Sequence, residues 1–181
     1  MEMENDLKYK IISIVNSHNP PNSFKKLIDQ LQNLSGYVII IDNSNDDIFE
    51  QSVKNIKVNE KIHLFHRRNL GLGEALNFGI SKAFSFGEDN YVLVVEDDAT
   101  LNENINILRI LENFLDSFKE NDVLFLNDHD NMKKKEGKVD SEFNEIKEHL
   151  GINMLFSQIK IFKKIKFREE FFMDQHDIDF Q

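Results

Sequence analysis

Three consecutive acidic residues, Glu96, Asp97 and Asp98, follow an apolar run over residues 91–95. The run is short and rich in β-branched residues, which is typical of a buried strand. Adjacent carboxylates at the end of a buried strand repel one another, and a divalent cation removes that repulsion. Carboxylate oxygens suit Mg²⁺ or Mn²⁺, which in turn hold phosphate groups. The acidic run therefore predicts a metal site for phosphate chemistry, and the alternative is an acidic turn that caps the next helix.

Polar segments also follow three other apolar runs, and they cover residues 16–21, 42–47 and 66–73. Ligands of open α/β sheets bind beyond the carboxyl ends of the strands. Four polar segments in this order therefore indicate one ligand site at one edge of a sheet. Asp42, the first polar residue after its strand, is predicted to bond a nucleotide base or ribose. The alternative is a turn aspartate that bonds its own backbone.

A glycine-containing loop precedes the helix predicted over 74–86. Glycine lets the backbone approach a ligand closely, and the N-terminus of a helix favours an anionic phosphate. Two arginines before the loop, Arg67 and Arg68, either pair with phosphate or lie in solvent. The polar and glycine residues expected to contact the ligand here are Asn69, Gly71, Gly73 and Asn77.

The same loop starts like the fingerprint of a dinucleotide-binding protein. Gly71 and Gly73 stand at its first two glycine positions, and Glu96 follows at about the twenty-residue spacing of its acidic residue. However, Leu76 occupies the position of the third glycine, and the strand before Glu96 ends in three acids that would repel a pyrophosphate. These departures argue against a Rossmann dehydrogenase.

An aromatic and acidic block closes the chain over residues 167–180. Its phenylalanines can pack a platform, and its carboxylates include Asp174 and Asp177. A carboxylate close to the metal site could deprotonate an acceptor hydroxyl. The alternative is the start of an amphipathic helix, with Asp174 or Asp177 as its cap.

The remaining pattern alternates predicted strands and helices, which indicates βαβ units and a doubly wound α/β sheet. The strands are expected over 10–15, 37–41, 62–65, 91–95, 123–126 and 152–156, and the helices over 23–34, 74–86, 104–118 and 157–165. The segment over 128–148 is polar and is predicted to be a flexible loop, with a mobile lid as the alternative. We expect residues 1–181 to form a single domain, truncated at its C-terminus.

Composition limits the classes of function. The chain has 181 residues and no cysteine, which excludes a disulfide framework, a thiolate metal site and a cysteine nucleophile. A net charge of −10 argues against a nucleic-acid partner, because phosphate binding needs a basic face. No apolar run approaches the length of a membrane span, and the acidic N-terminus does not resemble a secretory signal. These features predict a cytoplasmic protein.

Five blocks of the chain stand in a recognisable order, at residues 14–20, 40–44, 68–80, 96–98 and 167–180. They resemble the nucleotide loop, the aspartate–asparagine–serine motif, the asparagine–glycine block, the D-x-D motif and the acceptor block of GT-A fold glycosyltransferases of family 2. Within that family they resemble the bacterial rhamnosyltransferase-like and galactofuranosyltransferase-like branch. The resemblance implies a GT-A fold, with a mostly parallel central sheet and helices on both faces.

The resemblance also implies roles for single residues. Glu96 and Asp98 would hold Mn²⁺ or Mg²⁺, although Glu96 stands where the family has aspartate. Asp177 would be the catalytic base, with Asp174 as second candidate. The residues expected to bind the nucleotide-sugar are Ser17, His18, Asn19, Asp42, Asn43, Arg68, Asn69, Gly71, Asn77, Glu96 and Asp97.

The implied activity is inverting, metal-dependent transfer of a sugar from a nucleotide-diphosphate-sugar donor. The acceptor would be a hydroxyl of a glycan or lipid-linked precursor in bacterial surface polysaccharide synthesis. One alternative is a degenerate GT-A domain that binds nucleotide or glycan without turnover. A sugar-phosphate nucleotidyltransferase is disfavoured, because residues 16–21 contain neither the glycine nor the arginine of that class.

A basic cluster lies close to the C-terminal block despite the acidic total. One interpretation is peripheral contact with the inner face of an anionic membrane, and the other is a solvated helix face. The cluster comprises Lys160, Lys163, Lys164, Lys166 and Arg168.

Overall fold

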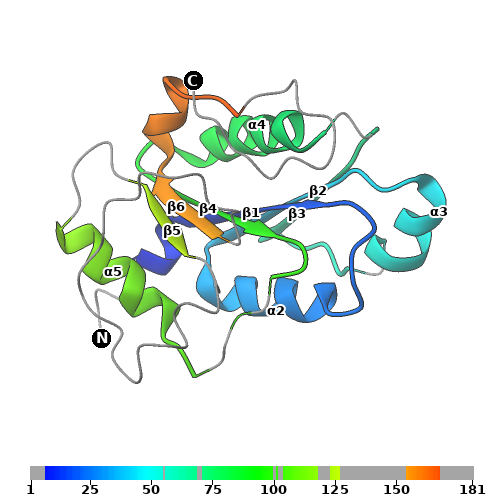
Figure 1. Ribbon diagram of the computed structural model, residues 1–181, viewed down its shortest axis with the longest axis horizontal. Helices are drawn as coiled ribbons and strands as arrows, with labels where there is room; N and C mark the ends of the chain where they lie inside the picture. The colour runs from blue at the N-terminus through cyan, green and yellow to red at the C-terminus, as the bar shows by residue number, and fades with distance from the viewer. Residues whose placement is uncertain are drawn as a thin grey trace.

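The apolar runs of the sequence form one six-stranded sheet in the computed structural model of the chain (Figure 1). The structure describes residues 7–54, 56–68, 71–99, 101, 104–117, 123–126 and 154–167. The strands are β1 (Ile11–Ser17), β2 (Tyr37–Asp42), β3 (Ile62–His66), β4 (Tyr91–Glu96), β5 (Leu124–Leu126) and β6 (Met154–Gln158). The predicted loop over 128–148 lies outside the described residues.

The strands lie in the order β3-β2-β1-β4-β6-β5. β1 pairs in parallel with β2 and β4, and β2 pairs in parallel with β3. β6 is antiparallel to both β4 and β5. The prediction of an α/β protein with a mostly parallel sheet is therefore confirmed, and the antiparallel part is confined to one side of the sheet.

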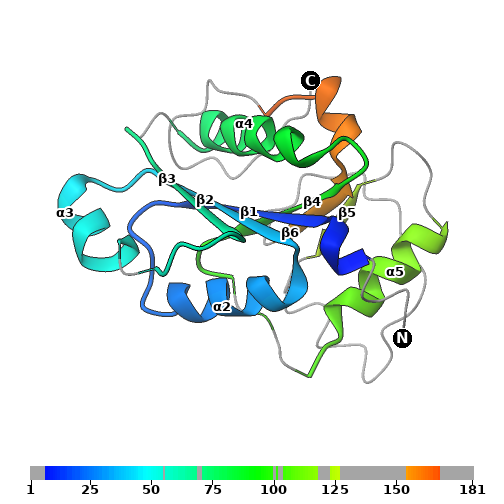
Figure 2. The same ribbon diagram turned by 180° about the vertical axis from the view of Figure 1, so that it is seen from behind.

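Helices cover both faces of this sheet, as Figures 1 and 2 show from opposite sides. α4 lies on one face, whereas α2 and α5 lie on the other. The helices are α2 (Phe24–Leu34), α3 (Asp46–Ile48), α4 (Leu72–Ala83) and α5 (Ile107–Ser117), together with a π-helix η1 (Phe49–Val53) and the 3₁₀ helices η2 (Phe84–Phe86) and η4 (Ile159–Lys163).

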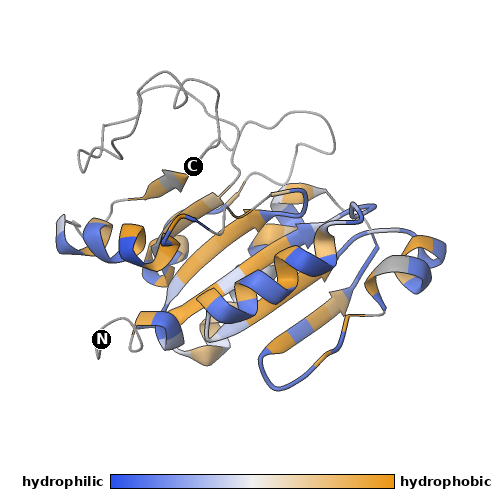
Figure 3. Cartoon of the chain, turned by 90° about the horizontal axis from the view of Figure 1, so that it is seen from below, coloured by the Kyte–Doolittle hydropathy of each residue, from blue (hydrophilic) through white to orange (hydrophobic). Residues whose placement is uncertain are grey.

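Each face of the sheet has its own hydrophobic core. Successive residues of a strand point to opposite faces, so Ile11 and Val15 of β1 pack with α2, whereas Ile12 and Ile14 pack with α4. All four side chains are fully buried. Burial on both faces explains why the strands are apolar throughout rather than alternating. Figure 3, seen from the α2 side, shows largely hydrophobic strands behind a helix with many hydrophilic residues.

The close approach of α4 to the sheet depends on a glycine. A Cβ atom on Gly79 would lie 2.6 Å from Cγ2 of Ile14 in β1. The helix can therefore rest directly on the strand only because this position carries no side chain. This contact fixes the helix that begins at the glycine-containing loop.

Two segments differ most from the sequence prediction, and the ends of β1, α4 and α5 are displaced by two or three residues. The strand expected over 152–156 is β6 at Met154–Gln158, and the following helix is a short 3₁₀ turn rather than an α-helix over 157–165. Residues 46–53, for which no helix was predicted, form α3 and η1. Among the described residues, no helix is both long enough and apolar enough to cross a membrane.

Candidate functional site

The parallel strands bring their polar ends to one edge of the sheet, on the side of the molecule where α3 lies (Figure 1). Ser17 at the end of β1 is paired with Asp42 at the end of β2. The neighbouring Asn16 is paired with Glu96 at the end of β4. Asp42 is in turn paired with His66, the last residue of β3. Residues predicted from three separate segments are thus brought onto adjacent strands.

The loop after β1 is held between the loops that follow β2 and β4. The His18 backbone N–H donates to Oδ2 of Asp97 at 3.1 Å, and its ring Nδ1 lies 3.0 Å from the carbonyl oxygen of Asn43. The Asn19 N–H donates to Oγ of Ser44 at 2.9 Å. Asn19 has a φ of 56°, a left-handed conformation that asparagine adopts more readily than most residues. His18 and Asn19 therefore shape the predicted nucleotide loop through their backbone N–H groups, and the His18 ring adds a further contact.

Asn43 joins the same loop from the side of β2. Its side chain is almost fully buried, and its Nδ2 donates to Oδ1 of Asn16 at 2.9 Å. Its backbone N–H donates to the carbonyl oxygen of Ser17 at 2.8 Å. Asn43 thus continues the β1–β2 pairing beyond the last residues of the strands.

Asp42 has no solvent-exposed surface in the described structure. One of its oxygens, Oδ1, accepts from Oγ of Ser44 at 2.8 Å, and Oδ2 lies 2.6 Å from Nδ1 of His66. A buried carboxylate needs such partners, because burial without them is costly. The predicted contact between Asp42 and a nucleotide base stays a prediction.

His66, Ser44 and Asp46 belong to this edge but were not predicted as site residues. Nε2 of His66 lies 3.0 Å from Oδ1 of Asp46, and its ring stacks on Phe49 with the centroids 4.1 Å apart. Asn45 starts the short helix α3 by accepting the N–H of Ile48 at 3.0 Å. The signal that could have found His66 was its position at the end of a predicted strand.

The three carboxylates after β4 have different surroundings. Glu96 and Asp97 are half-buried, whereas Asp98 is exposed. Burial raises the pKa of Asp97, and the nearby charge of Asp98 adds to the effect. The hydrogen bond from the His18 N–H opposes the rise. Asp97 therefore bonds the β1 loop from a half-buried position in which its ionised form is less favourable than in water. Asp98 is exposed to solvent.

The donor set at this edge suits a hard cation. Within the part of the chain that the structure describes, no three His, Asp or Glu side chains gather around one point. The predicted metal site therefore stays a prediction; if Glu96 and Asp98 hold a cation, they would supply two oxygen ligands and leave the remaining positions to water and phosphate. Mg²⁺ typically binds in this way, through one or two carboxylates and substrate phosphates.

The glycine-containing loop enters α4 through Gly71, whose φ of 98° lies in the left-handed region that favours glycine. Arg67 pairs with Glu74 at 3.1 Å and lies over the ring of Phe78. Arg68 is exposed and forms no ion pair with another described residue. Arg68 is therefore the more exposed of the two arginines, and its predicted contact with a phosphate stays a prediction.

Asn77 lies on α4, one turn beyond this loop. Its Nδ2 donates to the carbonyl oxygen of Phe167 at 2.9 Å, and its Oδ1 accepts the Phe167 N–H at 3.0 Å. The side-chain amide thus holds the backbone of the segment that leads toward the C-terminal block. Asn69, Asp174 and Asp177 lie outside the described residues, so their predicted roles stay predictions.

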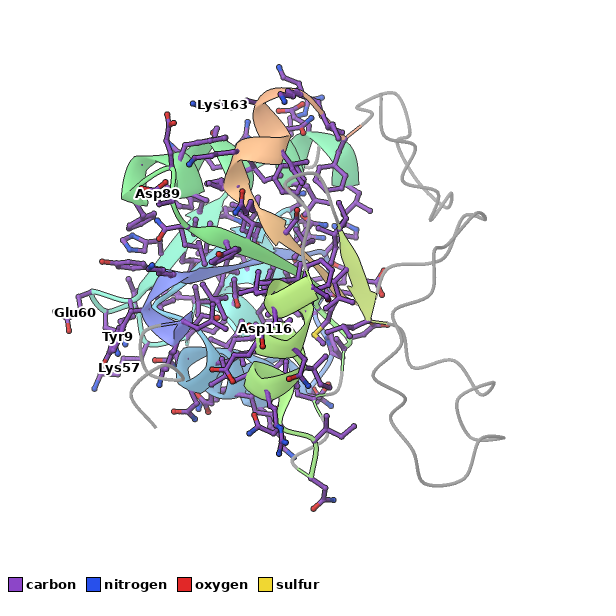
Figure 4. All side chains as sticks on the ribbon, turned by 90° about the vertical axis from the view of Figure 1, so that its left-hand side faces the viewer. Tyr9, Lys57, Glu60, Asp89, Asp116 and Lys163 are labelled. Carbon is purple, nitrogen blue, oxygen red and sulfur yellow. The ribbon has the colours of Figure 1, made fainter. Side chains whose placement is uncertain are left out.

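Part of the predicted basic cluster is paired with acidic residues. Lys160 bonds Asp89 at 2.7 Å, and Lys163 bonds Glu88 at the same distance. Figure 4 labels Asp89 and Lys163, which lie near η4. Both acids belong to the turn before β4, so these lysines dock η4 against that turn.

Known proteins resemble this chain in sequence and in fold. A family model described as "Glycosyl transferase family 2" matches residues 11–176. The uncharacterized glycosyltransferase MJ1057 of Methanocaldococcus jannaschii is 27% identical over 195 residues, which cover 98% of this chain and 66% of the relative.

Crystal structures of TarS from S. aureus are similar in fold. TarS 1-349 has a TM-score of 0.60 at 20% identity, with 92% of this chain and 52% of that chain covered. Its complex with UDP-GlcNAc has a TM-score of 0.55 at 19% identity, with 88% and 48% covered. The chain therefore spans 66% of the archaeal relative and about half of the TarS structures.

Proposed function

Because the chain belongs to glycosyl transferase family 2, we propose that it transfers a sugar from a nucleotide-diphosphate-sugar donor to a hydroxyl of a glycan or lipid-linked acceptor. The observation that carries the proposal is the acidic end of β4, which lies beside the β1 loop at the edge where strands of an α/β sheet present ligands. The UDP and UDP-GlcNAc complexes of TarS favour a uridine nucleotide as the first donor to test.

The proposed donor site extends across this edge. The base and ribose lie near Asp42 and the β1 loop, and the diphosphate lies between Arg68 and the acidic run. Glu96 and Asp98 hold Mn²⁺ or Mg²⁺, which when bound neutralises the charge of the leaving diphosphate. The exposure of Asp98 and Arg68 supports this arrangement, because both can reach a ligand without displacing a core residue.

The proposed transfer inverts the anomeric carbon. The acceptor oxygen bonds to that carbon while the bond from the carbon to the diphosphate oxygen breaks. A carboxylate of the C-terminal block, Asp177 or else Asp174, takes the hydroxyl proton. The nucleoside diphosphate leaves with the electron pair of the broken bond.

The proposed setting is the synthesis of a bacterial surface polysaccharide, in the rhamnosyltransferase-like or galactofuranosyltransferase-like branch of the family. The support is the order of the sequence blocks, above all residues 68–80. The protein would act in the cytoplasm at the inner face of the membrane. Because Lys160 and Lys163 are already paired with acids, membrane contact would depend mainly on Lys164, Lys166 and Arg168.

A binding and turnover experiment tests this function. Thermal unfolding is followed with UDP, GDP, CDP, ADP and dTDP, each with and without Mn²⁺, and release of the nucleotide from the matching sugar donor is measured. A ligand that binds only the folded state must raise its stability. We expect one nucleotide to raise Tm only with Mn²⁺, and expect Asp98→Ala to abolish the rise.

Asp116→Ala is the matched control for that variant. Asp116 is exposed on α5 and is labelled in Figure 4, which views the molecule from the side opposite α3. It should keep the full response. Binding without release of nucleotide from any sugar donor would favour the degenerate domain. A cooperative melt that no nucleotide shifts would overturn the proposed function.

A further inference from the structure

The imidazole of His66 lies between two carboxylates. Its Nδ1 is 2.6 Å from Oδ2 of Asp42, and its Nε2 is 3.0 Å from Oδ1 of Asp46. Its face stacks on the ring of Phe49 at an interplanar angle of 23°. The three partners come from β2, α3 and η1, so this one ring joins the end of β3 to the whole segment that follows β2.

Both ring nitrogens must donate in order to satisfy both contacts. Carboxylate oxygens only accept hydrogen bonds, and a neutral imidazole has a single N–H. The protonated ring makes both bonds, whereas the neutral ring makes one. Protonation of His66 therefore decides whether α3 and β2 are joined through this side chain.

The two bonds differ in how readily they break. The side chain of Asp42 is fully buried, whereas that of Asp46 is 96% exposed. If the bond to His66 broke, water could not reach the buried Asp42 to replace it. At the exposed Asp46, water can replace His66 at little cost. A neutral His66 therefore keeps Asp42 and releases Asp46, together with the short helix that Asp46 begins.

The charges around the ring favour its protonated form. Burial alone would lower the pKa of His66, but the hydrogen bonds and charges of Asp46 and Asp42 outweigh that effect and raise it. On η1 the ring faces Phe49, and Glu50 of that helix pairs with Lys54, the residue that follows it. The adjacent Arg67 is paired with Glu74 of α4.

We propose that protonated His66 is a positioning residue of the donor site, which fixes Asp42 and the segment over 43–49 in the arrangement that binds a nucleoside diphosphate. The proposal rests on the proposed function. Its consequence is that nucleotide affinity falls when His66 loses its proton, although His66 contacts no reacting atom.

Two neighbouring aspartates provide a matched test. Asp46→Asn removes the charge that bonds His66, and Asp47→Asn removes the same charge one residue away. Both positions are exposed, and in the described structure only Asp46 bonds the ring. Each variant is compared with the unmodified chain for affinity to the tightest binding of the five nucleoside diphosphates, with Mn²⁺, between about pH 6 and pH 8.5.

The His66 ring is titrated in parallel by NMR. In the unmodified chain we expect the affinity to fall by up to about tenfold over the pH range in which the ring deprotonates. Asp46→Asn should move the midpoint of the affinity profile and the midpoint of the His66 ring titration to lower pH together. Asp47→Asn should move neither midpoint. His66→Gln should remove this component of the pH profile, while any pH dependence of the nucleotide or metal persists in every variant.

The outcomes separate the inference from the function on which it rests. If the unmodified chain binds a nucleotide but Asp46→Asn and Asp47→Asn have the same pH profile, the role of His66 is overturned and the proposed function stands. If no nucleotide binds the unmodified chain at any pH, both are overturned. Because both aspartates lie at the surface, the comparison does not depend on the stability of His66→Gln.

Discussion

At the scale of single residues, the acidic run shows that three adjacent carboxylates can serve different purposes. Asp97 turns back to bond the His18 N–H, whereas Asp98 is exposed to solvent. In this inward position Asp97 holds the β1 loop, and burial there raises the pKa of its carboxyl group. Asp98 is exposed and is therefore open to a ligand, and its predicted role at a metal stays a prediction.

This difference gives a prediction for Asp97→Asn in the metal-free protein. Because the pKa of Asp97 is raised in the folded state, its contribution to stability is fully present below its unfolded pKa and is lost as pH rises through its folded pKa. Asparagine keeps an oxygen for the His18 N–H and carries no charge. With a chelator present at pH 7, Asp97→Asn should therefore raise Tm.

Solvent screening limits the effect of this partly exposed group to less than about 1 kcal/mol, or about 2–4 °C in a chain of this size. The gain should disappear near pH 4, where the carboxylate is itself protonated. The exposed Asp47→Asn is the control and should leave Tm unchanged. A loss of stability in Asp97→Asn at every pH would show that the loop requires a carboxylate rather than a neutral acceptor.

At the scale of elements, Asn77 ties α4 to the segment that leads toward the C-terminal block. Both ends of its amide bond the backbone of Phe167, which lies ninety residues away in the sequence. The ring of Phe167 also stacks on Phe162 of η4. The helix that begins at the glycine-containing loop is therefore physically joined to the entrance of the block predicted to bind the acceptor.

The clamp predicts a loss of stability. Asn77→Ala removes both hydrogen bonds and should cost about 1–3 kcal/mol, because the backbone groups of Phe167 lose their partner. Asn77→Asp keeps the acceptor for the Phe167 N–H but sets a carboxylate oxygen against the Phe167 carbonyl oxygen, so it should cost at least as much. Chemical denaturation measures both, and Ser81→Ala is the control, since Ser81 is exposed on the same helix and, among the described residues, bonds only within that helix. Equal stability of Asn77→Ala and Ser81→Ala would contradict the clamp.

Elements with a repeating apolar pattern could be predicted from the sequence, and elements without one could not. α2 buries Phe24, Leu27, Ile28 and Leu31 at helical spacing, and it was predicted within one residue. The α3–η1 segment has no such stripe and is held by the Asn45 cap and by His66. β6 was displaced by two residues, because its apolar run continues into η4 and only pairing with β4 sets its start.

The candidate site follows the same rule. The strand ends placed Ser17, Asp42 and Glu96 at one edge, because parallel strands end together. The bond between Asp42 and His66 could not be predicted, since it depends on the register of β2 against β3. Asn77 was predicted within a helix and lies on α4. Nothing in the sequence indicated Phe167 as its hydrogen-bond partner.

At the scale of the whole molecule, one sheet serves two hydrophobic cores. Leu31 of α2 is fully buried in the first, and Leu76 of α4 is almost fully buried in the second. The two cores share the backbone of the strands between them as a common wall, because alternate residues of each strand pack into opposite cores. Because neither core can lose its wall while the other keeps it, we expect the described fold to unfold as one unit.

Substitutions on opposite faces test this coupling. Leu31→Ala and Leu76→Ala should each lower the free energy of unfolding by about 2–5 kcal/mol, whereas Val58→Ala, at an exposed side chain, should have little effect. The chain has no tryptophan, so tyrosine fluorescence can report on each face. Tyr91 packs against the α2 core and Tyr37 against the α4 core.

The decisive comparison is between reporter and substitution on opposite faces. Tyr9→Phe is introduced throughout to remove the exposed third tyrosine. In that background, Tyr37→Phe leaves Tyr91 to report on the α2 side, and Tyr91→Phe leaves Tyr37 to report on the α4 side. Leu76→Ala should shift the unfolding midpoint reported by Tyr91 as far as the midpoint reported by Tyr37. Leu31→Ala should likewise shift both unfolding midpoints equally. Midpoints that separate by face would mean that the cores unfold independently. In that case the edge where the strands end could stay intact while one layer of helices is lost.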